Sequence, residues 1–151
     1  MPRDYHILSL DDAEKMVRAA VEHVKAQGLP PMAVVVVDRA GEILSGSRMD
    51  TVHPRYFNAA HRKAYSGAIF ERSTPGMNEM WSRQQGEGHK GPSDWNDSML
   101  TTLPGGLCVT NDEDGRPQVV GGIGVAGDEE ADEVAIAVIA VQALGQHFHY
   151  K

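Results

Sequence analysis

The sequence has only one cysteine, Cys108, among its 151 residues, so no disulfide can form within the chain. So low a cysteine content is typical of reducing compartments, where disulfides are rare. The first residues, MPRDYH, lack the apolar stretch of a secretory signal. The longest apolar run, residues 134–144, is interrupted by Gln142 and is shorter than the roughly 20 residues needed to cross a bilayer. These absences predict a cytoplasmic protein without a membrane partner.

Positive charge is also scarce. The chain has 14 Lys and Arg against 21 Asp and Glu, which gives a formal net charge of -7 at pH 7. Without a basic cluster, this balance disfavours nucleic acid, because phosphates would be repelled. At this length and with 41% hydrophobic residues, the chain can bury one core, so we expect a single domain over residues 1–151.

Several catalytic and binding motifs are missing as well. The sequence contains no Walker A motif, no dinucleotide-binding glycine motif, no G-x-S-x-G and no H-E-x-x-H. Nucleotide-binding and serine-hydrolase functions are therefore disfavoured, and no metal site is expected. His147 and His149 form an H-x-H pair, but we expect them to lie in a frayed tail, which makes a poor metal site.

The first half of the chain predicts a helix, a β-hairpin and a second helix. Ser9 with Asp12 resembles a capping box, and apolar residues then recur at helical spacing up to Gly28. The apolar run 32–37 predicts a strand covered on both faces, which the turn DRAG connects to a second strand over 42–48. A helix that starts at Pro54 carries a face of small residues, which permits close packing. These are Ala59, Ala60, Ala64, Gly67 and Ala68.

The second half predicts a short helix capped by Ser73 or Thr74, an irregular and mobile segment over 86–102, a second hairpin and a last helix. Asp128 is expected to cap the last helix, with the acids at 129, 130, 132 and 133 in its first turn. Since residues 134–144 are apolar nearly all round, we expect one side of this helix to meet the sheet and the other a second subunit, giving a homo-oligomer. The elements predict an α+β fold in the order α-ββ-α-α-ββ-α, with helices covering an antiparallel sheet of about five strands.

Four segments in this order resemble the GlcG/HbpS-like family of haem-binding or haem-degrading proteins, which also supplies the C-terminal domain of some corrinoid adenosyltransferases. The segments are VVVVDRAGEILSGSRMD, AAHRKAYSGAIF, PGGLCV and GGIGVAGDEEADEVA. The resemblance covers nearly the whole chain. It implies a compact α+β fold of profilin- or roadblock-like layout, assembly into dimers or larger oligomers, and haem as a cofactor.

Arg48 and Asp50 follow the second predicted strand and match the family's R-M-D. A guanidinium there can clamp a ligand carboxylate, with the acid orienting it, or the two side chains can pair and fix the turn. Lys63 matches the family's K-A and is either an anion anchor, a base or Schiff-base amine, or an ordinary solvated lysine. His53 and His61 are outside the family pattern. They can ligate iron or move protons, or simply lie at the surface.

Glycines form the other candidate region. Pro104, Gly105 and Gly106 match the family's P-G-G, and paired glycines either form an anion-binding nest or make a tight turn into a strand. The glycines at 121, 122 and 124 allow close approach of a ligand or of the small-faced helix. Cys108 is interpreted as a buried small hydrophobe rather than a nucleophile. The tryptophans and methionines that flank 86–102 form a lid over an apolar ligand or pack the loop.

Two functions remain open, and the residues leave undecided whether the chain is an enzyme. In the first, it binds haem, a related tetrapyrrole or a small anion, with Arg48, His61, Lys63 or the Pro104–Gly106 bend contacting the ligand. In the second, it is a small lyase, isomerase or decarboxylase for a carboxylate-bearing metabolite, aromatic-derived acids among them. Arg48 then holds the substrate while Asp50, His53 or Lys63 moves a proton. Both hypotheses require these elements to converge on one cavity.

Overall fold

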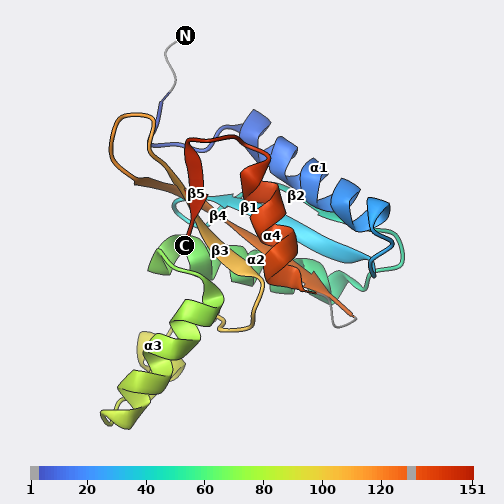
Figure 1. The fold of residues 1–151 in the computed structure, drawn as a ribbon. Helices are drawn as coiled ribbons and strands as arrows, with labels where there is room; N and C mark the ends of the chain where they lie inside the picture. The colour runs from blue at the N-terminus through green and yellow to red at the C-terminus, as the bar shows by residue number, and fades with distance from the viewer. Residues whose placement is uncertain (1–3, 129–131) are drawn as a thin grey trace.

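The structure, a computed structural model, describes residues 4–128 and 132–151. Within these ranges it contains four α-helices, one 3-10 helix and a single five-stranded sheet (Figure 1). The elements are α1 (Leu10–Ala26), β1 (Met32–Asp38), β2 (Ile43–Arg48), α2 (Pro54–Phe70), α3 (Thr74–Gly86), η1 (Gly91–Trp95), β3 (Gly106–Asn111), β4 (Gln118–Gly127), α4 (Glu133–Gln142) and β5 (Phe148–Tyr150). The strand order is β2-β1-β4-β3-β5, and all neighbours are antiparallel. The predicted α+β class and element order are confirmed.

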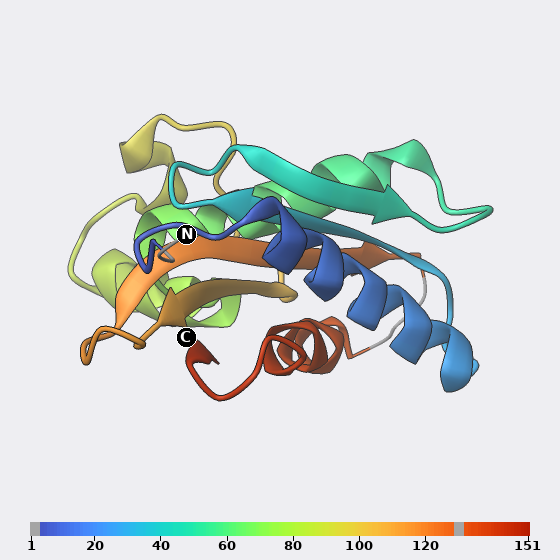
Figure 2. The same cartoon turned by 90° about the horizontal axis from the view of Figure 1, so that it is seen from above.

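Helices cover both faces of the sheet (Figure 2). α1 and α4 pack on one face, against a core that includes Val34 and Val36 of β1. α2 packs on the other face, against Val35 and Val37 of the same strand. β1 is therefore buried on both sides, as its uninterrupted apolar run predicts. No helix in these ranges is both long and apolar enough to span a membrane.

α2 lies directly on β4 because neither surface carries bulky side chains. A Cβ atom added at Gly122 would overlap the carbonyl oxygen of Ala64, and one added at Gly124 would overlap that of Ala60. Only glycine fits at these two positions. Close packing of the helix on the sheet, rather than a ligand, thus accounts for them.

The last helix begins later than predicted. Its N-cap is Asp132, whose carboxylate accepts a hydrogen bond from the backbone N–H of Ala135 at 3.0 Å. The prediction that Asp128 caps this helix was wrong: Asp128 accepts a hydrogen bond from the Tyr56 hydroxyl at 2.6 Å. In a run of acids, only the one directly before the first helical residue has the geometry of a cap. The predicted acids at 129 and 130 lie outside the described residues.

α4 contacts both the sheet and α1, with Ile136, Ala137, Ala140 and Val141 buried in the core that it shares with them. Two intramolecular neighbours therefore account for much of its all-round apolar surface. The contact with a second subunit through this helix stays a prediction.

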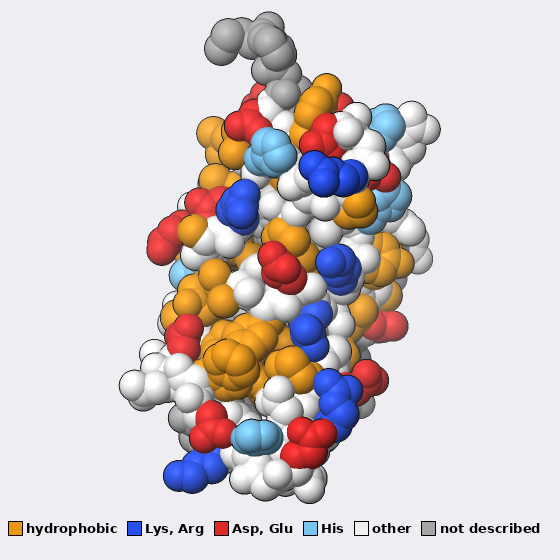
Figure 3. Space-filling model, turned by 90° about the vertical axis from the view of Figure 1, so that its left-hand side faces the viewer, with side chains coloured by type: hydrophobic (Ala, Val, Ile, Leu, Met, Phe, Trp, Pro, Cys, Tyr) orange, Lys and Arg blue, Asp and Glu red, His pale blue; other side chains and the backbone are white. Residues whose placement is uncertain are grey.

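The segment after α2 forms a projection with its own small core. α3 extends away from the sheet layers (Figure 1) and buries Met77, Met80 and Trp81 against Phe70 and Leu100. The aromatic ring of Trp95 in η1 stands edge-on to that of Phe70, with 4.7 Å between centroids. These side chains pack the loop together. On this side of the molecule, Figure 3 shows hydrophobic side chains gathered toward the α3 end, where Trp95 is 47% exposed.

β5 was not predicted. It pairs with β3 at the edge of the sheet, with Val109 opposite Tyr150 and Asn111 opposite Phe148. The end of the chain is fixed there by two further bonds, from Lys151 N–H to the Cys108 carbonyl at 3.0 Å and from Cys108 N–H to the Lys151 carbonyl at 3.2 Å. The expectation of a frayed tail was wrong, because a three-residue strand is too short to show an alternating pattern.

Candidate functional site

Arg48 is the last residue of β2. Its guanidinium donates a hydrogen bond to the carbonyl oxygen of Val52, which ties the strand end to the residues that lead into α2. Arg48 and Asp50 are both exposed. They line a hollow of about 290 Å³ together with Val21 and Lys25 of α1, Ser47 of β2 and Met49, which follows β2. None of its lining residues belongs to α2.

The two histidines of this region have local partners. His53 is the N-cap of α2, and its Nδ1 accepts a hydrogen bond from the backbone N–H of Arg55 at 3.1 Å. The Nε2 of His61 lies 3.1 Å from the carbonyl oxygen of Gly41, in the β1–β2 turn. That turn is at the opposite end of β2 from Arg48, so His61 and Arg48 are not brought together.

Lys63 is buried on the sheet-facing side of α2. Only 4% of the residue is exposed. Its Nζ donates to the carbonyl oxygen of Val125 at 2.8 Å and to Oε2 of Glu133 at 2.6 Å. The other oxygen of Glu133 accepts from the backbone N–H of Gly127 at 3.1 Å. One lysine therefore links α2, the end of β4 and the first turn of α4.

The glycine bend lies against this ion pair. Gly105 has φ = +120°, and a Cβ atom there would lie 3.0 Å from Glu133 Oε2 and 3.1 Å from Lys63 Nζ. The carbonyl of Gly105 accepts from Val125 N–H at 2.9 Å, and Gly106 N–H donates to Thr74 Oγ1 at 3.1 Å. The structure thus brings Lys63 and the Pro104–Gly106 bend together.

The remaining predicted site residues lie apart from this pair. The contacts of Arg48 and those of Lys63 have no residue in common. Asp50, His53 and His61 belong to the β2 exit, the α2 N-terminus and the β1–β2 turn respectively. The enzyme hypothesis requires Arg48 and a proton-transferring side chain, Asp50, His53 or Lys63, around one ligand. In the described part of the chain, these side chains do not meet at one site.

A cleft of about 350 Å³ opens instead on the outward side of α2. It lies between this helix and the segment that leads to the glycine bend. Its lining residues are Arg55, Asn58, Ala59 and Arg62 of α2, with Leu100, Thr101 and Leu103 of the segment. Its volume is in the range of about 300–1,000 Å³ that is usual for small-molecule sites. We call it the α2 cleft.

Two hydrogen bonds fasten the segment along α2. The backbone N–H of Thr101 donates to Oγ of Ser66 at 2.9 Å. The hydroxyl of Tyr65 donates to Oδ2 of Asp97 at 2.7 Å, and this hydrogen bond is the main reason why the pKa of Tyr65 is raised. The wall of the cleft is therefore held by side chains of the same helix that forms its floor.

The two arginines of the cleft differ in how they are held. Arg55 donates to the Tyr56 hydroxyl at 2.9 Å and lies 3.7 Å from Asp128. Its guanidinium also lies over the Tyr56 ring, 4.9 Å from the centroid. Arg62 is exposed and makes no ion pair with any other described residue. It is therefore the cation more available to a ligand.

The sequence contained a signal for this cleft. Arg55, Ala59 and Arg62 recur at positions i, i+4 and i+7, the spacing of one helix face. Arg55 and Arg62 lie opposite the buried Ala60 and Ala64, whereas Ala59, which the sequence pattern assigns to the small-residue face, is half-buried at the border between the two faces. What the sequence does not give is the segment at 100–103, because its position depends on contacts with Ser66 and Tyr65 that are distant in the chain.

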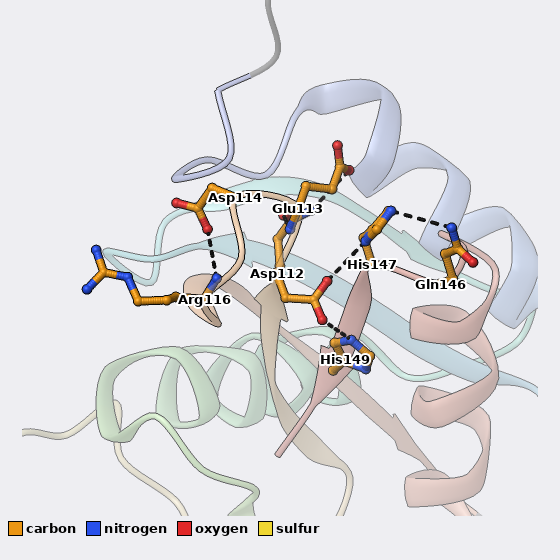
Figure 4. Close-up of polar contacts among 8 residues, drawn as sticks. Asp112, Glu113, Asp114, Arg116, Gln146, His147 and His149 are labelled. Carbon is orange, nitrogen blue, oxygen red and sulfur yellow. Dashed lines mark hydrogen bonds and ion pairs between the residues drawn. The ribbon is translucent and has the colours of Figure 1, made fainter.

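Cys108 and the H-x-H pair each have surroundings that account for them without a ligand. Burial raises the pKa of Cys108 to about 11, so it is a protonated thiol at neutral pH, in line with its interpretation as a buried hydrophobe. His147 and His149 point at the carboxylate of Asp112 (Figure 4), with N–O distances of 3.1 Å and 2.9 Å. No group of three or more acids, histidines or cysteines in residues 4–128 and 132–151 could hold a metal ion.

Comparisons with known proteins agree with the fold. The model of a family described as "Haem degrading protein HbpS-like" matches residues 8–142. Protein GlcG of Escherichia coli strain K12 is 29% identical over 120 residues, which are 80% of this chain and 81% of GlcG. A double mutant of Streptomyces reticuli HbpS is 32% identical, with a TM-score of 0.75 over 97% of this chain and 92% of that one. The crystal structure of a PduOC–haem complex is 26% identical, with a TM-score of 0.75 over 91% and 94%.

Proposed function

The chain belongs to the HbpS-like family, and from that premise we propose that it binds haem or a related tetrapyrrole in the α2 cleft. The observation that carries the proposal is the pair of guanidiniums beside apolar walls in this cleft, on an otherwise acidic chain. A structural relative over most of the chain, PduOC, is a haem complex, which supports this class of ligand.

Charge is the first supporting feature. A tetrapyrrole of this kind carries carboxylates on one edge of a flat ring, and arginine binds carboxylates in a planar, two-bond geometry. Arg55 and Arg62 are separated by two helical turns, about 10.5 Å along the axis. Arg62, which forms no ion pair with another described residue, can donate hydrogen bonds to a ligand carboxylate. Arg55 would exchange its long contact with Asp128, at 3.7 Å, for one with the ligand.

The apolar walls are the second feature. Ala59 supplies a small surface on α2, while Leu100 and Leu103 face it from the segment. Leu103 is 60% exposed, which is a large fraction for a leucine and would fall on contact with a ring. In this proposal the cleft of about 350 Å³ covers one face of the tetrapyrrole, and the other face stays open.

The lining residues fit the edge of a tetrapyrrole but not its centre. None of the lining side chains within the described ranges is a histidine, cysteine, methionine or tyrosine, the usual axial ligands of haem iron. The nearby His61 is directed to Gly41 instead. The protein's role in this proposal is to bind the carboxylates and shield one face of the ring; the redox chemistry of the iron is the cofactor's own.

Haemin titration followed by the Soret band tests the proposal. We expect saturable binding, weakened by Arg62→Ala and by Arg55→Ala. Each substitution should raise Kd by about tenfold, the lower end for a charge-assisted hydrogen bond. Arg62→Ala should have the larger effect because Arg55 has alternative partners. Arg83→Ala on α3 removes the same charge outside the cleft and should leave Kd unchanged.

A second titration addresses the absence of an axial ligand. Metal-free protoporphyrin IX keeps the ring and both carboxylates, so it should bind within about threefold of haemin if the edge and ring carry the affinity. Absence of a saturable haemin spectrum would overturn the proposal. An equal loss of affinity in Arg83→Ala would show that only general electrostatic attraction is involved.

A further inference from the structure

A pocket of about 280 Å³ lies at the C-terminal end of α3, and the described residues that line it all differ from those of the α2 cleft. They are Gln84 of α3, His89 in the turn after that helix, and Asp94 and Trp95 of η1. We call it the α3 pocket. The proposed tetrapyrrole site uses none of these side chains.

Hydrogen bonds fix the backbone around this pocket. Gly88, with φ = +96°, reverses the chain after α3, and the N–H of His89 donates to the carbonyl of Gln84 at 3.0 Å. This is the hydrogen bond of a Schellman cap. The N–H of Lys90 then donates to Oδ2 of Asp94 at 2.8 Å. The backbone that carries the lining side chains is therefore organised before any ligand binds.

Trp95 gives the pocket a flat aromatic surface. Its ring packs against Phe70 with 4.7 Å between centroids and 85° between the ring planes, so packing fixes the orientation of the indole. Trp95 is nevertheless 47% exposed, whereas Trp81 in the core beside it is 2% exposed. Figure 3 shows acidic and histidine side chains next to the hydrophobic patch at this end of the molecule. A tryptophan that is fixed by packing and still in contact with water offers a surface on which a ligand ring can stack.

The other lining side chains are polar and available. The amide of Gln84, the imidazole of His89 and Oδ1 of Asp94 form no hydrogen bond or ion pair with another described residue. An amide and an imidazole can both donate and accept hydrogen bonds, and a carboxylate accepts them. None of the described lining residues is a lysine or an arginine, so this pocket offers no cation to a carboxylate or phosphate ligand.

These groups match a sugar ring better than other small ligands. A pyranose has a face of C–H groups with a slight positive charge, which complements the negative face of an indole. Each of its hydroxyls both donates and accepts hydrogen bonds, so it can use a mixed set of polar partners. A quaternary ammonium ion is also attracted to an indole face, but it forms no hydrogen bonds with an amide or an imidazole. The pocket volume, about 280 Å³, is close to the lower end of the usual range for ligand sites, which suits a single ring.

We propose that the α3 pocket binds a neutral saccharide, with a pyranose ring stacked on the indole of Trp95 and its hydroxyls bonded to the three polar side chains of the pocket. This activity goes beyond tetrapyrrole binding and does not depend on it. The two sites have different described lining residues, and their ligands differ in charge.

Titration with the methyl glycosides of glucose, galactose, mannose and N-acetylglucosamine tests the proposal on the full chain, with NMR detection of the indole N–H groups. The chain has two tryptophans, and the Trp95→Phe variant assigns their two signals. We expect at least one glycoside to shift the Trp95 signal saturably, with a Kd on the order of 1 mM. The Trp81 signal should stay in place because this side chain is buried. Sorbitol, which has hydroxyls but no ring, should give no saturable shift.

Substitution of a polar side chain separates specific binding from general contact with an exposed ring. Gln84→Ala should raise the Kd for the glycoside about fivefold, as expected for one lost hydrogen bond. Gln27→Ala removes an exposed glutamine at the end of α1 and should leave the Kd unchanged. An unchanged Trp81 signal in Gln84→Ala shows that the core beside the pocket is intact. The proposal is wrong if no glycoside shifts the Trp95 signal saturably, if Gln84→Ala binds as tightly as the wild type, or if choline shifts this signal and the glycosides do not.

Discussion

The molecule contains two contacts between a carboxylate and nitrogen-bearing side chains, in opposite surroundings. In one, Lys63 pairs with Glu133 at 2.6 Å, and the two side chains are 5% and 17% exposed. In the other, Asp112 contacts His147 and His149 at 3.1 Å and 2.9 Å, and the three side chains are 35–52% exposed. The first pair has been removed from water and must remain matched, whereas water solvates the second whether or not it forms.

Their positions in the fold differ in the same way. Lys63 and Glu133 connect three elements, α2, β4 and α4, across the end of the sheet. Asp112 connects only the end of β3 with β5, whose strands are already joined by backbone pairing. Lys63, the lysine that matches the family pattern, therefore has a structural role: it neutralises the carboxylate of Glu133. The local sequence around Lys63 gives no sign of this partner.

The largest expected loss of stability follows from breaking the buried Lys63–Glu133 pair. Lys63→Ala leaves the carboxylate of Glu133 partly buried and without its cation, so we expect the free energy of unfolding to fall by about 3–5 kcal/mol. Urea denaturation at pH 7 measures it, with Lys15→Ala on α1 as an exposed lysine control expected to change little.

The double variant Lys63→Met, Glu133→Leu sharpens the interpretation. Replacing both charges with apolar side chains of similar size removes the unmatched charge, so this variant should be more stable than Lys63→Ala. A loss of less than about 1 kcal/mol in Lys63→Ala would mean that the pair behaves like an exposed one, and the contrast with Asp112 would disappear.

The second effect concerns the bend beside the pair. Gly105→Ala places a methyl group against the Val125 carbonyl and the ion pair, at a residue with φ = +120°. We expect a loss of about 1–3 kcal/mol in the free energy of unfolding. Gly115→Ala is a matched control, because Gly115 has φ = +95° but no atom within 4 Å of an added Cβ.

The difference between these two glycine variants isolates packing from backbone strain, since both residues have positive φ. The loss in the free energy of unfolding should be larger for Gly105→Ala than for Gly115→Ala by about 1 kcal/mol. Equal losses would show that the bend is limited by its backbone conformation alone, and that the ion pair tolerates a displaced neighbour.

Most of the fold could be predicted from local patterns. The Ser9 cap, the β-branched run of β1 and the small-residue face of α2 each determine structure through neighbours a few residues away. β5 could not be predicted, because three residues become a strand only when β3 is beside them. The start of α4 was misplaced because several adjacent acids are equally good caps by type.

The candidate site was less accessible to sequence reasoning. Arg48 and Lys63 are close in sequence, yet the strand exit and the helix direct them to different partners, Val52 and Glu133. Glu133 is 70 residues from Lys63, and no local pattern indicates their contact. The glycine-facing side of α2 could be predicted because close packing restricts residue size, whereas the outer side, with Arg62, is exposed and carries no such restriction.

The smallest expected effect is at the exposed cluster, where it should depend on pH. Hydrogen bonds from His149 and His147 lower the pKa of Asp112 below its ordinary value of 3.8. The folded state therefore favours the charged carboxylate, so the stabilisation is present above the unfolded pKa and is lost as the pH falls through the lower, folded one. Asp112→Asn should be slightly less stable than the wild type at pH 6, and this gap should close below about pH 4.

Urea denaturation of both proteins at pH 6, 5, 4 and 3 measures this gap, with each protein compared at the same pH. Asp114→Asn in the same hairpin removes an equal charge without a histidine contact, so any gap that it shows reflects net charge only. Because water already solvates the Asp112 cluster, its contribution should stay far below that of Lys63 at every pH. A loss in Asp112→Asn as large as that in Lys63→Ala would show that burial is not what separates the two contacts, and that the short β5 strand depends on its histidines as strongly as α4 depends on its glutamate.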